Sequence, residues 1–188
     1  MAIPAGNDDR AITSLPPRLR TTPVQTLEEW RALDTVADKL ASTARDAIDR
    51  TGAGPLLSGS WLGHPVHPML VDLPIGFWTS AWILDLVPTS STRTAARRLV
   101  GLGVLTALPA AVTGWNDWST MTGSRRRVGL VHAGVNTAAV LTYAASWRAR
   151  HRGHQVRGIA LGWLGAAVAT VGGYLGGHLA FGKTGDGS

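Results

Sequence analysis

The chain has 188 residues, enough for one domain with an appendage, and its 45% hydrophobic content alone does not separate a soluble protein from a membrane protein. Its formal net charge of +6 comes almost entirely from arginines that gather in short bursts beside long uncharged runs. No basic recognition motif accompanies that charge, which argues against a nucleic-acid partner, and the lack of cysteine excludes disulfides, thiolate metal sites and covalently attached c-type haem.

The first 54 residues predict a tail followed by a helix. Residues 1–26 are polar and rich in proline, which predicts a disordered tail without the apolar core of a signal peptide. Residues 27–54 predict an amphipathic helix and a linker, because apolar side chains recur at three- and four-residue intervals until Gly52, Gly54 and Pro55. The apolar stripe comprises Leu27, Trp30, Leu33, Val36, Leu40, Ala44 and Ile48. Its polar face mixes acids and bases, so we expect this helix to dock on the protein's own membrane domain or on a partner rather than on anionic lipid.

Residues 55–183 predict an integral membrane four-helix bundle, so that the whole chain is expected to be all-α. Its four apolar segments span 69–87, 99–116, 128–147 and 158–182. A bilayer core of about 30 Å needs roughly 20 helical residues, and each segment approaches that length. Three of these runs lack a water-facing side, which disfavours a soluble bundle. Tryptophans fall at the predicted boundaries as an aromatic belt would: Trp61, Trp115, Trp118 and Trp147.

Two details qualify this bundle. The first segment is the weakest, since Asp72 and Asp85 lie within it, and Asp85 has no expected role beyond pairing with a loop arginine. The fourth segment is dense in glycine, with two pairs spaced four apart: Gly172 with Gly176, and Gly173 with Gly177. Small residues at that spacing let another helix, or a flat cofactor, approach the backbone closely, and helix packing accounts for most of them.

The order of the helices predicts that four of the six histidines share one leaflet. His64 and His67 precede the first segment, His132 lies about one turn inside the third, and His178 lies about one turn from the end of the fourth. An antiparallel chain brings these four to the same side of the membrane, together with Asp72, Asp117 and Asn136. His151 and His154 fall in an arginine-rich loop on the opposite side.

Each histidine has a structural explanation when it is taken alone, such as a stiff turn between prolines or a hydrogen bond between helices. Jointly they predict a site, because ionisable groups in a membrane are costly and tend to mark one. Imidazole suits iron, copper and zinc, and two facing histidines hold haem iron from both sides. We therefore expect haem b or a transition metal ion bound by His132 and His178, with His64 and His67 as further metal ligands or a lid. Asp72, Asp117 and Asn136 would orient the ligands.

Four stretches of the sequence resemble a family of small bacterial membrane proteins, domain of unknown function 2231. They are the run from Trp61 to Gly76, the run from Thr113 to Trp118, the run from Val128 to His132 with Asn136, and the run from Gly172 to Leu179. The resemblance covers about 55–182. Similar proteins are sometimes linked to a Rieske iron–sulfur domain, which implies electron transfer and a redox partner. Many members of the family have a histidine where this chain has Asp72.

The preferred hypothesis is thus a membrane protein that binds haem b or a metal ion and serves in or beside membrane electron transfer. The alternative is a cofactor-free scaffold or assembly partner for a respiratory or Rieske-type protein. Proton or ion translocation is weaker, because no ionisable group lies midway along the last three segments. No catalytic constellation is recognised, so an enzyme acting alone is not expected.

The expected location is the bacterial plasma membrane, crossed several times. The loops opposite the histidines hold seven arginines, whereas the histidine side holds five cations. The first set is Arg93, Arg97, Arg98, Arg148, Arg150, Arg152 and Arg157, and the second is Arg50, Arg125, Arg126, Arg127 and Lys183. Because positive loops stay in the cytoplasm, this difference predicts that the histidine face is extracytoplasmic.

Overall fold

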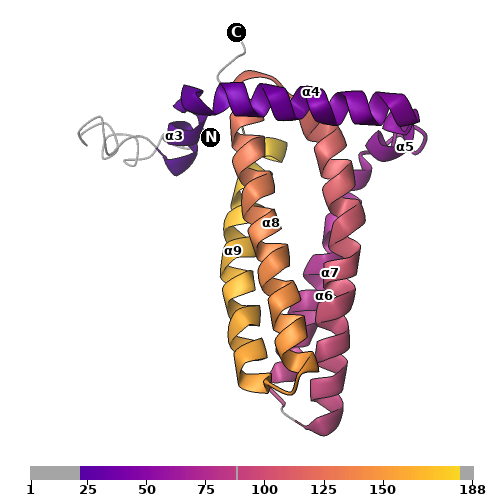
Figure 1. Cartoon of the computed structure of the whole chain (residues 1–188), viewed down its shortest axis with the longest axis vertical. Coiled ribbons are helices and arrows are strands. Elements are labelled where there is room, and N and C mark those ends of the chain that lie inside the picture. Colours follow the sequence, from indigo (N-terminus) through magenta and orange to yellow (C-terminus); the bar gives the residue numbers. More distant parts are fainter. Residues whose placement is uncertain (1–21, 88, 183–188) are drawn as a thin grey trace, which may run out of the picture.

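The computed structural model describes residues 22–87 and 89–182, and all of the regular structure within them is helical. The short elements are α3 (Pro23–Glu29), the 3-10 turn η1 (Arg31–Leu33), α4 (Asp34–Thr51) and α5 (Gly54–Ser58). The long helices are α6 (Val66–Asp85), α7 (Ser90–Ser119), α8 (Gly123–His151) and α9 (Gln155–Phe181). In Figure 1 the long helices run side by side along the long axis, and α4 lies across one end of them.

Three of the long helices, α7, α8 and α9, are long and apolar enough to cross a membrane. The helix α6 is not among these three, and it contains two aspartates, Asp72 and Asp85. Large apolar side chains point away from the protein on α7, as they do on a surface made for lipid: Leu102, Leu105, Leu108 and Val112.

The long helices begin earlier than the apolar segments predicted. The helix α7 starts at Ser90 rather than 99, and α8 starts at Gly123 rather than 128. Thr89 and Thr92 form a capping box, in which each side chain accepts a hydrogen bond from the other residue's backbone N–H, so α7 begins there. Polar residues do not end a helix, and the first turns of α7 and α8 therefore extend beyond the apolar runs.

The helices α8 and α9 pack through complementary faces, one polar and one of glycine. The inward face of α8 presents residues that are three, four or seven positions apart: His132, Asn136, Tyr143, Ser146 and Arg150. The facing residues of α9 are glycines at the same kind of spacing: Gly158, Gly162, Gly165, Gly172 and Gly176. A Cβ atom at Gly165 would lie 3.0 Å from the ring of Tyr143. This regular spacing is that of antiparallel coiled helices, and the glycines make room for large polar side chains.

Aromatic side chains join the α6–α7 pair to the α8–α9 pair. Trp78 of α6 stacks on Tyr143 of α8 with ring centroids 3.9 Å apart, and it lies over Gly103 of α7. Trp82 stacks on Trp163 of α9 with centroids 5.5 Å apart. These contacts, with Ala81, Ala96 and Val100, make the main apolar core.

Asp85 pairs with an arginine, as the sequence predicted. Its two carboxylate oxygens accept hydrogen bonds from Nη1 and Nη2 of Arg150 at 2.7 and 2.6 Å. The side chain of Arg150 is 0% exposed and that of Asp85 is 6% exposed, so this ion pair is buried. It fixes α6 to α8 at the end of the bundle away from α4.

The N-terminal segment docks on the protein's own long helices, which is one of the two expected outcomes. Arg126 and Arg127, in the first turns of α8, pair with Asp38 at 2.5 Å and with Asp34 at 2.8 Å. Arg127 also donates to the carbonyl of Glu28, and Arg45 donates to the carbonyl of Ser119 at the end of α7. The segment therefore ties the ends of α7 and α8 together.

The amphipathic helix predicted within residues 27–54 is interrupted: α3 ends at Glu29, and η1 and α4 follow it, while α5 begins at the end of the predicted linker. The chain turns at Trp30, and the buried face of α4 is shifted by one residue from the predicted apolar stripe. Ala37 and Ala41 are buried, whereas Val36 and Leu40 of the predicted stripe are exposed. The small alanines let α4 lie close to Trp118. Of the predicted tail 1–26, residues 1–21 lie outside the described part, and α3 begins at Pro23 rather than after residue 26.

The aromatic belt holds for only part of the expected tryptophans. Trp61 and Trp147 are exposed at 65% and 42%. Trp118 is buried beneath α4, and its Nε1 donates to the carbonyl of Arg126 at 2.9 Å. Trp118 thus packs the docked N-terminal segment rather than lipid.

Candidate functional site

His67 lies in the first turn of α6 and is held by α7. Its Nδ1 lies 2.8 Å from the carbonyl oxygen of Ala110, and Thr113 Oγ1 lies 3.4 Å from the same nitrogen. The ring rests against Gly114, where an added Cβ would come within 2.7 Å of His67 Cε1. Glycine at position 114 is therefore what lets the imidazole lie against the α7 backbone.

His132 is held in a similar way between α8 and α9. Its Nδ1 lies 2.9 Å from the carbonyl oxygen of Gly172. Asn136, one turn further along α8, donates to the carbonyl of His132 at 2.9 Å, and its Nδ2 lies 3.3 Å from both ring nitrogens. An added Cβ at Gly176 would lie 2.9 Å from His132 Cε1, and one at Gly172 would lie 2.5 Å from Asn136 Oδ1. His132 and Asn136 thus share one helix face, as predicted from their spacing.

These contacts fix the proton on each ring. A carbonyl oxygen only accepts hydrogen bonds, so Nδ1 of both His67 and His132 carries the proton. With the proton on Nδ1, the Nε2 atom of a neutral imidazole keeps its lone pair, and in His132 the Nδ2 atom of Asn136 lies 3.3 Å from that nitrogen. Asp117, near the end of α7, accepts a hydrogen bond from Asn116 at 3.2 Å.

His178 takes part in a different contact from the one expected. Its Nε2 lies 2.9 Å from Oε1 of Glu28 in α3, and the two side chains are 27% and 25% exposed. Val24 of the same short helix packs with Leu175 and Val128. The end of α9 is therefore joined to the N-terminal segment through His178.

His64 and Asp72 stand apart from these residues. Both side chains are exposed, His64 before the start of α6 and Asp72 on the outer face of that helix. Within residues 22–87 and 89–182, no three side chains of histidine, aspartate or glutamate converge in a way that would hold a metal ion. His67 and His132 are the two histidines whose Nδ1 atoms lie against backbone carbonyls of neighbouring long helices.

Several residues of this site were missed by sequence reasoning. Thr113 and Gly114 fall in one of the stretches that resemble the family, so their position carried a signal. Glu28 carried none, because it is 150 residues away from His178 and lies in a region of mixed charge. The backbone carbonyls of Ala110 and Gly172 are invisible in any sequence pattern.

A family model described as "Predicted membrane protein (DUF2231)" matches residues 63–185. The match includes His64, His67, His132 and His178 and all of the long helices from α6 to α9. No curated protein and no solved structure matches the chain.

Proposed function

We propose that this chain, which belongs to the family of predicted membrane proteins DUF2231, binds haem b or a transition metal ion and serves in or beside membrane electron transfer. The observation behind the proposal is that His67 and His132 make the same kind of hydrogen bond. Each ring gives its Nδ1 proton to a backbone carbonyl of a neighbouring helix, at 2.8 and 2.9 Å. Histidines that bind metals are oriented by such bonds, which leave Nε2 as the ligand atom.

The residues fit an imidazole-bound group. Neutral imidazole is a ligand for iron, copper and zinc, and the chain has no cysteine to offer a thiolate. A bound haem or redox-active ion would supply one-electron transfer. His67 and His132 would hold the group. The lack of a side chain at Gly114 and Gly176 lets these two imidazole rings lie close to the helix backbones. Asp117 and Asn136 would tune the charge around it.

His178 and His64 have lesser parts in this proposal than the sequence suggested. His178 would become a ligand only if its Nε2 left Glu28, to which it is hydrogen-bonded at 2.9 Å. His64 is exposed and would act as a further ligand or a lid only after a movement of the turn before α6. The pair His67 and His132 therefore replaces the pair His132 and His178 as the favoured ligands.

The proposal includes four membrane crossings, with α6 as the fourth, in a bacterial plasma membrane. The helix α6 packs along α7, and its outer face exposes Met69, Leu73, Ile75 and Ile83. The histidine end would be extracytoplasmic, because the opposite end holds seven arginines in its helix ends and loops. The test is a reporter that is active only in the cytoplasm, fused to the end near α4. Activity of this fusion would contradict the orientation.

The experiment uses the full chain purified in detergent after expression with haem precursor and, separately, with added metals. We expect a haem absorption band or a near-stoichiometric metal content in the wild type. His132→Asn removes Nε2 but keeps an amide donor near the position of Nδ1, so it should abolish binding while the fold persists. His151→Asn, at the opposite end, is the matched control and should bind normally. A wild type without a haem band and without bound metal refutes the proposal.

A second candidate is a cofactor-free scaffold for a respiratory or Rieske-type partner. It is favoured by one observation: His67, His132 and His178 each hydrogen-bond a different element of the chain, so each has a structural role without any ligand. The scaffold predicts that His132→Asn assembles with its partners as the wild type does. The cofactor protein instead loses its chromophore or metal with the same substitution.

A further inference from the structure

Six arginines at the end of the bundle away from α4 form no ion pair with any described residue. They come from the start of α7, the end of α8 with the turn after it, and the start of α9: Arg93, Arg97, Arg98, Arg148, Arg152 and Arg157. All are exposed except Arg97, which is half-buried. We call this set the arginine face.

At the end of the bundle near α4, four arginines are bonded to other elements of the chain. Arg125 donates to the carbonyl of Leu179 at 2.7 Å, and Arg126 and Arg127 pair with Asp38 and Asp34. Arg45 donates to the carbonyl of Ser119. Four arginines are thus bonded to other elements of the chain where α3 and α4 cover the helix ends, whereas the six arginines of the arginine face have no such partner among the described residues.

The arginine face has no acidic group to balance it among the described residues. The one carboxylate nearby is Asp85, and both of its oxygens are bound by the buried Arg150. The charges of Asp85 and Arg150 cancel each other, so the charge of the six arginines of the arginine face remains unbalanced. Open guanidinium groups at this density attract anions, and the planar fork of each matches two phosphate oxygens.

Apolar side chains lie at the same level as these charges. Leu86, Val87 and Val156 are exposed at 74%, 57% and 83%, and Trp147, exposed at 42%, stacks on His151 with ring centroids 5.6 Å apart. Arginine together with tryptophan and aliphatic residues is typical of the boundary between lipid tails and headgroups. The anion that meets this face is therefore one attached to a lipid.

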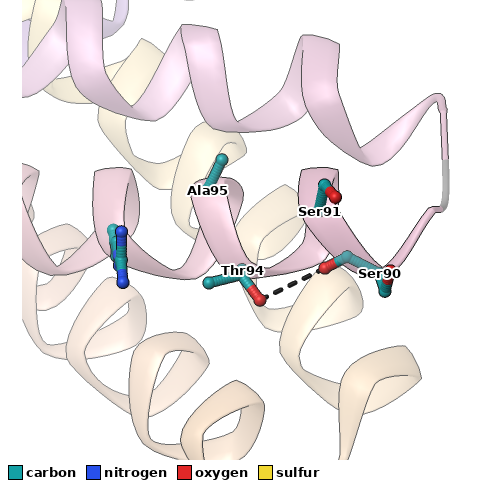
Figure 2. Close-up of a pocket in the computed structure, with 5 residues that line it drawn as sticks. Ser90, Ser91, Thr94 and Ala95 are labelled. Atoms are coloured by element: carbon teal, nitrogen blue, oxygen red, sulfur yellow. Dashed lines mark hydrogen bonds between the residues drawn. The ribbon is translucent and has the colours of Figure 1, made fainter.

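At the start of α7, hydroxyl groups lie beside Arg98. Ser90, Ser91, Thr94 and Ala95 line a shallow open pocket with it, and Thr94 Oγ1 donates to the Ser90 carbonyl at 3.2 Å (Figure 2). This pocket adds hydroxyl groups to the arginine face at the start of α7.

We propose that the arginine face is a binding surface for the headgroups of anionic phospholipids. The proposal is independent of the histidine site, since it involves none of the same residues. It predicts that the protein selects anionic over zwitterionic lipid through this end alone.

The test measures the thermal unfolding of the full chain in detergent mixed with phosphatidylglycerol or with phosphatidylcholine. The variant Arg98→Gln/Arg148→Gln/Arg157→Gln removes one charge from each helix of the arginine face. The matched control, Arg31→Gln/Lys39→Gln/Arg50→Gln, removes the same charge from the other end. We expect phosphatidylglycerol to raise the Tm of the wild type and the control more than phosphatidylcholine does, and the variant to lose at least half of that difference.

Other outcomes overturn the proposal. Equal shifts by the two lipids, or equal losses in the variant and the control, would mean that this face does not select anionic lipid. A shift produced by inorganic phosphate alone would assign the surface to a free anion instead. If the variant does not fold, the salt dependence of the wild type is the test. The Tm difference between phosphatidylglycerol and phosphatidylcholine should fall at least twofold between about 50 and about 500 mM NaCl, and an unchanged difference refutes the proposal.

Discussion

Replacing Asp85 with asparagine should be among the most damaging single changes in this chain. Asparagine keeps the shape of aspartate, but it leaves Arg150 with no counter-charge in a place where its side chain is 0% exposed. Two hydrogen bonds of 2.7 and 2.6 Å lose their ionic acceptor at once. Breaking a buried pair from one side costs about 3–5 kcal/mol of stability.

The matched control is Asp38→Asn. Asp38 also pairs with an arginine, at 2.5 Å, but its side chain is 64% exposed, so that solvent screens the interaction. Such a pair contributes about 0–1 kcal/mol. The two substitutions are chemically identical, but the pair of Asp85 is buried and joined by two hydrogen bonds, whereas that of Asp38 is exposed and joined by one.

The stability of both variants is measured by unfolding in mixed micelles with an increasing mole fraction of dodecyl sulfate. The loss of the helical circular dichroism signal reports the unfolding. The double variant Asp85→Asn/Arg150→Met should be less destabilised than Asp85→Asn, because it no longer holds an unpaired charge. If Asp85→Asn costs no more than Asp38→Asn, or if the double variant is the worse of the two, the buried charge is not the cause and the reasoning is refuted.

Three further outcomes follow from contacts in the structure. Gly103→Ala places a Cβ 2.2 Å from Trp78 Nε1 and should destabilise the protein by about 1–3 kcal/mol in the same unfolding assay, whereas Gly76→Ala, with nothing within 4 Å, should not. Gly176→Ala should displace His132 and reduce cofactor loading, measured as absorbance or metal per protein, while Gly177→Ala should leave it unchanged. Arg127→Gln should loosen α3 and α4, seen as faster amide exchange in residues 23–51, and equal exchange would contradict the docking role of Arg127.

The sequence predicted the long helices because long uncharged runs are a strong signal. For Asp85 it offered only a pairing with a loop arginine, and the partner, Arg150, lies in the last turn of α8. It did not predict which of two adjacent glycine pairs in α9 packs against α8. Gly172 and Gly176 receive Asn136 and His132, whereas added Cβ atoms at Gly173 and Gly177 would meet nothing within 4 Å. The two pairs differ by one position, and composition cannot fix the rotation of a helix.

Helix order predicted that four histidines lie toward one end of the bundle, but it did not predict their contacts. The family match covers residues 63–185 and describes a predicted membrane protein. The partners of His67 and His132 are backbone carbonyls, which every residue has, so no residue type marks them. Glu28 lies in a helix that starts inside the predicted tail, and its bond to His178 depends on the docking of α3.

The polar face of α8 also bears on how the protein enters a membrane during its synthesis. Alone in lipid, α8 would expose His132 and Asn136 to hydrocarbon, an arrangement that is strongly unfavourable. The backbone of α9 shields these groups because its glycines allow close approach. We therefore expect the translocation machinery to release α8 and α9 into the bilayer as one hairpin, so that a chain truncated before α9 would be retained or degraded.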